Sequence, residues 1–164
     1  MTTIRPTGLD DIPFLEQMLL EAFFWRPDQP RPDIQAFTNS SLEFQKLLRD
    51  WGRPGDSAVI AEANGQPVGA AWFRFWTDQE HSYGYVNPKT PEIGIAVHPD
   101  WRSQGLGRAI LKALLEAAQR QGVEQISLSV EPEKYARKLY ESEGFVKVDQ
   151  VDGSWTMLFN LGKR

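Results

Sequence analysis

Residues 98–110, HPDWRSQGLGRAI, constrain the fold of this chain more than any other stretch. Gly105 and Gly107 stand at the start of a segment whose apolar residues recur with helical spacing. Glycine costs a helix about 1 kcal/mol relative to alanine, so a pair of glycines here needs a physical reason. The free N–H groups at a helix start bind phosphate, and glycine lets the anion approach the backbone. Because Arg102 and Arg108 can add charge-assisted hydrogen bonds, the stretch predicts a diphosphate site.

Hydrophobic periodicity along the rest of the chain predicts a mixed α/β domain. Apolar residues at helical spacing indicate helices, and alternating or β-rich apolar runs indicate strands. Asn64 and Gly65 separate two such runs and suit the left-handed torsions of a tight hairpin turn. The expected order is strand, two helices, three strands, helix, strand, helix and two strands. The strands are expected at 2–6, in a hairpin over 57–77, and at 92–97, 126–130, 144–148 and 154–160, and the helices at 8–24, 41–51, 105–122 and 133–144.

Length and composition favour one domain over residues 1–164. A net charge of −4 lacks the basic excess of a nucleic-acid binder, and the apolar runs are too short to span a membrane. The N-terminal residues MTTIRPTGLDD do not resemble a secretory leader, so a cytoplasmic location is expected. The sequence has no cysteine, which excludes disulfides, thiolate metal sites and a cysteine-acyl intermediate.

Three nucleotide-binding motifs compete for the paired glycines. A Walker A loop fails, because no Gly-Lys-Ser/Thr follows Gly105. A dinucleotide fingerprint needs a third glycine where Ile110 stands and a first glycine closer to Val97, although Glu131 can imitate its ribose-binding acid. A nicotinamide-dependent oxidoreductase therefore stays as a weaker alternative. The third motif, R-x-x-G-x-G, fits residues 102–107.

This third motif and its surroundings resemble the GNAT N-acetyltransferase family. EIGIAVHPDWRSQGLGRAILKALLEAA matches the family's strand, diphosphate loop and helix, and LSVEPEKYARKLYESEGF resembles its second signature. The resemblance is close from Glu92 to Phe145. It implies a mixed central sheet of six to seven strands, splayed between the fourth and fifth and flanked by about four helices. One departure is Glu133, where the family often has an asparagine three residues before the position of Ala136.

The resemblance implies acetyl-CoA as co-substrate and no metal. In the family the pantetheine arm pairs with backbone groups of the strand before the diphosphate loop, and the diphosphate binds the amides of that loop. The residues implied to bind acetyl-CoA are Ile95, Ala96, Val97, Arg102, Ser103, Gln104, Gly105, Leu106, Gly107, Arg108 and Ala109.

The resemblance also implies the chemistry, which is attack of a deprotonated amine on a thioester. Without cysteine, direct transfer in a ternary complex is favoured, and the Val97 N–H is expected to stabilise the oxyanion. Some relatives carry a glutamate at the position of Glu92, so Glu92 is the expected base. Tyr140 matches the tyrosine that the family places near the CoA sulfur, so Tyr140 is the expected acid. The alternative for Glu92 is a solvated glutamate at a strand start, and the alternative for Tyr140 is a tyrosine that only packs in the core. His98 and His81 are rival bases by intrinsic pKa, but His98 precedes Pro99 and is expected to be a turn residue.

The acceptor is expected to be a primary amine of a small molecule or a peptide. In the family, recognition comes from the first two helices and the loop before the central strand, where Phe24, Trp25, Tyr83 and Tyr85 can line a pocket. Packing explains these aromatic residues equally well. A GNAT-like module that senses acyl-CoA without turnover is the main alternative function. The sequence leaves the oligomeric state open, a homodimer included.

Overall fold

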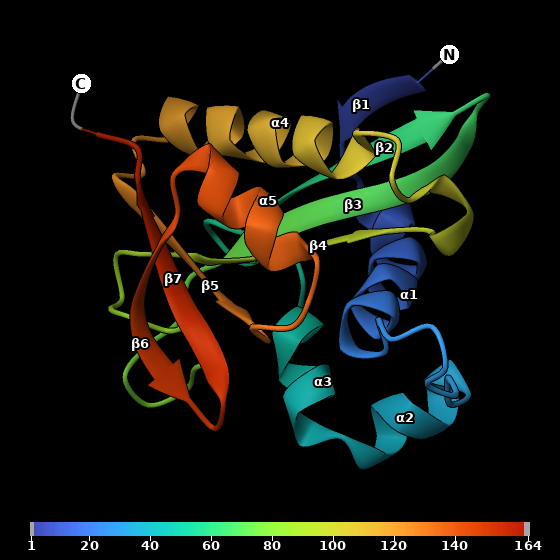
Figure 1. Cartoon of the computed structure of the whole chain (residues 1–164), viewed down its shortest axis with the longest axis horizontal. Coiled ribbons are helices and arrows are strands. Elements are labelled where there is room, and N and C mark those ends of the chain that lie inside the picture. The colour runs from blue at the N-terminus through green and yellow to red at the C-terminus, as the bar shows by residue number, and fades with distance from the viewer. Residues whose placement is uncertain (1, 163–164) are drawn as a thin grey trace. The chain divides into compact units, whose positions relative to one another are not determined.

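The computed structural model describes residues 2–162 and contains two compact units. The first comprises the residues up to Trp72 together with Gly94–Leu114, and the second comprises Phe73–Ile93 together with the residues from Leu115 on. The strands form a mixed sheet in the order β1-β2-β3-β4-β5-β7-β6. Their bounds are β1 Thr2–Pro6, β2 Ser57–Ala63, β3 Gln66–Arg74, β4 Glu92–Val97, β5 Gln125–Val130, β6 Val146–Val151 and β7 Ser154–Asn160 (Figure 1).

Five α-helices occur among the described residues, one more than the sequence predicted. They are α1 Ile12–Phe23, α2 Ile34–Ser40, α3 Leu42–Leu48, α4 Leu106–Arg120 and α5 Ala136–Glu143, with 3₁₀ turns at Leu9–Asp11 and Pro99–Trp101. The additional helix is α2, which covers residues to which the sequence assigned neither helix nor strand. The Asp33 carboxylate accepts a hydrogen bond from Ala36 N at 3.1 Å, and the Ser41 hydroxyl accepts one from Phe44 N at the start of α3. Two N-caps thus define two short helices, and α3 lies within the predicted helix at 41–51.

In the first unit the strands carry side chains toward helices on both faces. Leu15, Met18 and Leu19 of α1 pack with Ile60 of β2 and Trp72 of β3 in one buried cluster. On the other face, a Cβ at Gly69 of β3 would lie 2.8 Å from Cδ1 of Ile110 in α4. Neighbouring positions of a strand point to opposite faces, so α1 and α4 cover β3 from its two sides (Figure 1).

The turns around the sheet follow from local sequence. Asn64 and Gly65, between β2 and β3, have φ of 53° and 80°, which confirms the predicted tight hairpin turn. Asp152 and Gly153 have φ of 51° and 85° and join β6 to β7 in the same way.

In the second unit β5 pairs antiparallel with β7, and β7 pairs antiparallel with β6. Strands β4 and β5 are parallel, and between described residues their ladder has one pair, Glu92 with Ser127. The predicted mixed sheet, with its strands separating between the fourth and fifth, is confirmed. Across the part of the chain that the structure describes, no helix is both long and apolar enough to span a membrane.

Candidate functional site

The predicted diphosphate loop is an exposed turn before α4, in the first unit. Ser103 and Gly105 have φ of 63° and 78°, in the left-handed region that favours glycine. A Cβ at Gly105 would meet no atom within 4 Å, so this glycine serves the backbone conformation and not internal packing. Ala109 N donates to Gly105 O at 3.3 Å, at the start of a helix whose N-terminal end points the positive pole of its dipole at this turn. Buried Leu106 anchors the turn, whereas Gln104 and Arg108 are exposed.

Arg102, just before this turn, bonds to protein groups on two elements. Its Nε donates to the carbonyl oxygen of Val97 at 3.1 Å. Its Nη2 donates to Oε1 of Glu21 in α1 at 3.2 Å, and that carboxylate also pairs with Arg31. Sequence reasoning assigned Arg102 to the anion and gave no role to Glu21 or Arg31, since neither belongs to a recognisable motif.

The side chains of strand β4 alternate between the two faces of the sheet. Ala96 belongs to the cluster on the α1 side, and a Cβ at Gly94 would lie 2.6 Å from the Trp72 ring on that side. Val97 points the other way, toward Gly69. The backbone directly after β4 is hydrogen-bonded to β3, because His98 N donates to the carbonyl oxygen of Val68 at 2.8 Å.

Glu92, the predicted base, lies at the start of β4 in the second unit and is half-buried. Trp76 Nε1 donates to its Oε1 at 3.0 Å, and Gly84 N donates to its Oε2 at 3.0 Å. Trp76 and Gly84 therefore orient the carboxylate, a support that sequence reasoning did not find.

Tyr140, the predicted acid, lies in α5 and is 5% exposed. Its ring contacts Phe145 with centroids 5.6 Å apart, and no described residue forms a hydrogen bond with its hydroxyl. Burial raises the pKa of Tyr140 above its ordinary value, because the phenolate is poorly solvated there. The hydroxyl thus stays protonated at any ordinary pH.

The two histidines occupy turns. Nδ1 of His98 accepts a hydrogen bond from Asp100 N at 3.2 Å and caps the 3₁₀ turn Pro99–Trp101, in keeping with its predicted turn role. The His81 ring stacks on Tyr85 with centroids 4.3 Å apart, and its Nδ1 lies 3.0 Å from the carbonyl oxygen of Ser82. The Tyr85 hydroxyl donates a hydrogen bond to Asp78, and this bond raises the pKa of Tyr85 to about 12.

The four aromatic residues proposed for acceptor binding lie in different settings. Phe24 packs edge-to-face on Phe37 with centroids 5.1 Å apart, as part of the α1–α2–α3 packing. Trp25 has the Arg26 guanidinium 4.4 Å from its ring centroid. Tyr83 is 46% exposed and lines a pocket in the second unit.

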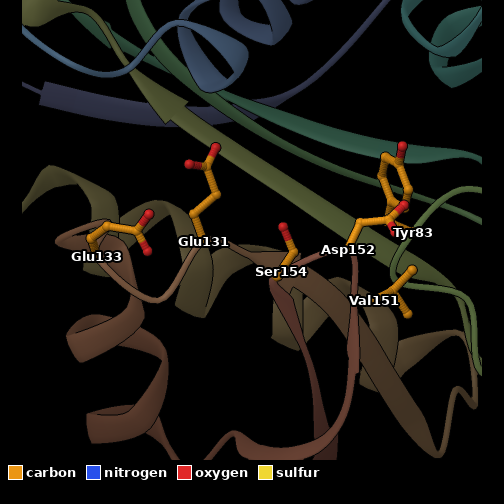
Figure 2. A pocket seen from close by; sticks show the side chains of 7 residues that line it. Tyr83, Glu131, Glu133, Val151, Asp152 and Ser154 are labelled. Atoms are coloured by element: carbon orange, nitrogen blue, oxygen red, sulfur yellow. The ribbon is translucent and has the colours of Figure 1, made fainter.

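This pocket has a volume of about 330 Å³ (Figure 2). Apart from Tyr83, its walls come from the segment after β5 and from the β6–β7 turn, with Glu131, Glu133, Val151, Asp152, Gly153 and Ser154. The pocket therefore presents three carboxyl groups and a tyrosine, a lining that suits a cationic ligand. No three His, Asp or Glu side chains between residues 2 and 162 are arranged to hold a metal ion. Periodicity did not reveal the pocket, because residues distant in the sequence form it.

A model of the acetyltransferase (GNAT) family matches residues 13–145. The chain belongs to this family. The match includes the turn before α4, Glu92 and Tyr140, and it takes in residues of both units. The family assignment made from the two motifs is confirmed.

Curated relatives are longer than the stretch they share with this GNAT chain. A mycothiol acetyltransferase of Saccharomonospora viridis is 28% identical over 129 residues, which cover 78% of this chain and 40% of that protein. An L-amino acid N-acyltransferase MnaT of Escherichia coli is 32% identical over 98 residues, which cover 59% of this chain and 54% of that protein. A [ribosomal protein bS18]-alanine N-acetyltransferase of Escherichia coli is 46% identical over 54 residues, covering 32% and 36%. The chain spans about half or less of the length of these relatives.

Solved structures share the fold along nearly the whole chain. YncA, a putative acetyltransferase from Salmonella typhimurium determined with its cofactor acetyl-CoA, superposes with a TM-score of 0.71 at 24% identity and covers 100% of this chain and 96% of its own. A PaiA N-acetyltransferase from Thermoplasma acidophilum in complex with coenzyme A gives 0.73 at 15% identity, covering 98% and 99%. The predicted GNAT fold is confirmed.

Proposed function

We propose that this protein is an N-acetyltransferase that moves an acetyl group from acetyl-CoA to a primary amine by direct transfer in a ternary complex. The observation that carries the proposal is the exposed turn at the start of α4, where Ser103 and Gly105 have positive φ. Such a turn fits a diphosphate. Membership of the GNAT family and the relatives' names, acetyltransferases and N-acyltransferases, support the transfer chemistry.

Acetyl-CoA supplies the acetyl group as a thioester. We assign its diphosphate to the backbone of residues 104–109 and to Arg108, and its pantetheine arm to the backbone of Ile95, Ala96 and Val97. Both the turn and the end of β4 lie in the first unit, whereas the two proposed catalytic residues lie in the second. The two units are proposed to act as one acetyltransferase domain, since the family match takes in both.

Glu92 accepts the proton that the ammonium of the acceptor must lose before nitrogen can attack, directly or through a water. Its orientation by Trp76 and Gly84 supports this role. Attack forms the C–N bond and an oxyanion, which the Val97 N–H stabilises. As the oxyanion collapses, the C–S bond breaks and the nitrogen loses its second proton to solvent. Tyr140 donates its proton to the departing thiolate, and its raised pKa, which keeps the hydroxyl protonated, supports this role. The products are an N-acetylamine and CoA.

We place the acceptor in the pocket lined by Tyr83. The carboxyl groups of Glu131, Glu133 and Asp152 line the same pocket, and negative charge attracts an ammonium.

The test combines acetyl-CoA binding with turnover on a panel of amines. Calorimetry measures the Kd for acetyl-CoA, and thiol release is followed with amino acids, polyamines, lysine peptides and peptides with a free N-terminus. Turnover with one amine class, with N-acetylamine formed in equal amount, supports the proposal. Binding without release from any amine favours the acyl-CoA sensor instead. A chain that binds NADH and not acetyl-CoA contradicts both functions.

A further inference from the structure

Glu21 is a buried carboxylate on the apolar face of α1. It is 8% exposed and stands beside buried Leu20. Burying a carboxylate without a partner is strongly unfavourable, so its contacts indicate why it is there. Arg31 approaches it in fork geometry, with Nη2 2.6 Å from Oε1 and Nε 2.9 Å from Oε2. Arg102 donates from Nη2 to the same Oε1 at 3.2 Å.

Arg102 connects this carboxylate to the backbone at the end of β4. Its Nε holds the carbonyl oxygen of Val97 at 3.1 Å, five residues back in the chain. The two bonds fix one guanidinium between α1 and the end of β4, directly before the turn that contains Gly105. A planar guanidinium can make both bonds at once, whereas a lysine ammonium is a point charge on a flexible stem.

We propose that Glu21, Arg31 and Arg102 form a clamp that sets the shape of the turn before α4, and that Arg102 is a positioning residue for acetyl-CoA. This inference rests on the proposed function. Arg102 acts through geometry, because its Nη2 is bonded to Glu21 and its Nε to the carbonyl oxygen of Val97. The charge that the diphosphate contacts is that of exposed Arg108. Arg31, from the segment between α1 and α2, is tied to the same carboxylate and so stabilises the clamp.

The first test separates geometry from charge by calorimetry with acetyl-CoA on the full chain. Arg102→Lys and Arg102→Gln are both expected to weaken binding about tenfold, because neither residue can bridge Glu21 and Val97. For Arg108, lysine should preserve clearly more affinity than glutamine. Arg120→Gln, an exposed position in the last turn of α4, controls for the change in net charge and should stay within about twofold of the parent. Arg102→Lys binding like the parent while Arg102→Gln fails would overturn the inference and assign Arg102 to the diphosphate.

The second test asks whether Glu21 acts through Arg102. Glu21→Gln should weaken acetyl-CoA binding several-fold, and adding it to Arg102→Gln should weaken binding little further, since residues in one network are not additive. In the Glu21→Gln and Arg102→Gln variants, activity with S-acetylpantetheine, which lacks the diphosphate, should fall much less than activity with acetyl-CoA. Equal losses with both donors would indicate general damage to the fold and contradict the clamp. Tighter binding by Glu21→Gln would also contradict it, by showing that Glu21 merely repels the anion. A parent chain that does not bind acetyl-CoA would refute the proposed function itself.

Discussion

Replacing Tyr140 by phenylalanine tests the proposed acid with a change of one oxygen atom. The ring contact with Phe145 is preserved, and no described residue loses a hydrogen-bond partner. A hydroxyl that makes no hydrogen bond within the protein adds little to stability. We therefore expect the free energy of unfolding at pH 7 to change by less than about 1 kcal/mol. A packed tyrosine with no catalytic role would show this small effect and nothing else.

If Tyr140 protonates the thiolate, kcat should fall about 100-fold while the Kd for acetyl-CoA stays near that of the parent. A factor of 100 corresponds to about 2.7 kcal/mol in activation free energy, within the usual range for general acid catalysis. The affinity is spared because the lost interaction develops only as the thiolate forms. Because burial raises the pKa of Tyr140, its loss of a proton should produce no decline in the rate up to about pH 10.

The assay is single-turnover thiol release, with calorimetry for binding and circular dichroism for the folded fraction. A donor whose leaving thiol has a lower pKa should rescue the variant more than the parent, since its departure needs less protonation. The acid role is refuted if Tyr140→Phe keeps full kcat with chemistry rate-limiting, or if its activity falls only with its folded fraction.

The raised pKa of Tyr140 also predicts a stability effect at high pH. The unfolded tyrosine releases its proton near pH 10, while the folded one keeps it. The unfolded state then binds fewer protons, so this stabilising contribution is present below about pH 10 and is lost as pH rises further. Glu92→Gln should lower kcat/KM about 100-fold and remove the acidic limb of the pH–rate profile; an unchanged profile would return Glu92 to a solvated glutamate. Trp76→Phe removes one donor to that carboxylate and should lower kcat more than the affinity for acetyl-CoA, whereas equal losses in both would speak against an orienting role. Gly107→Ala should raise helix stability by up to about 1 kcal/mol yet weaken acetyl-CoA binding at least tenfold; calorimetry showing parental affinity would contradict the diphosphate loop.

Much of the fold could be predicted from the sequence, because the deciding signals are local. Asn64-Gly65 specifies a tight hairpin through backbone torsions of two adjacent residues, and Gly105 marks the turn before α4 in the same way. The alternation of β4 follows from the two-residue period of a strand. Helix α2 was missed, because its seven residues are too few to show a periodicity and only the local cap at Asp33 marks its start.

The sequence by itself determined the family, the turn before α4 and the residue types of the proposed acid and base. Tertiary structure alone decided what surrounds them. Glu21 and Arg102 are 81 positions apart, and Trp76 and Glu92 are 16 apart, so no local pattern encodes either hydrogen bond. The raised pKa of Tyr140 and the carboxylate-lined pocket likewise arise from folding. Backbone torsions depend on near neighbours, whereas desolvation and side-chain partners depend on which distant segments pack together.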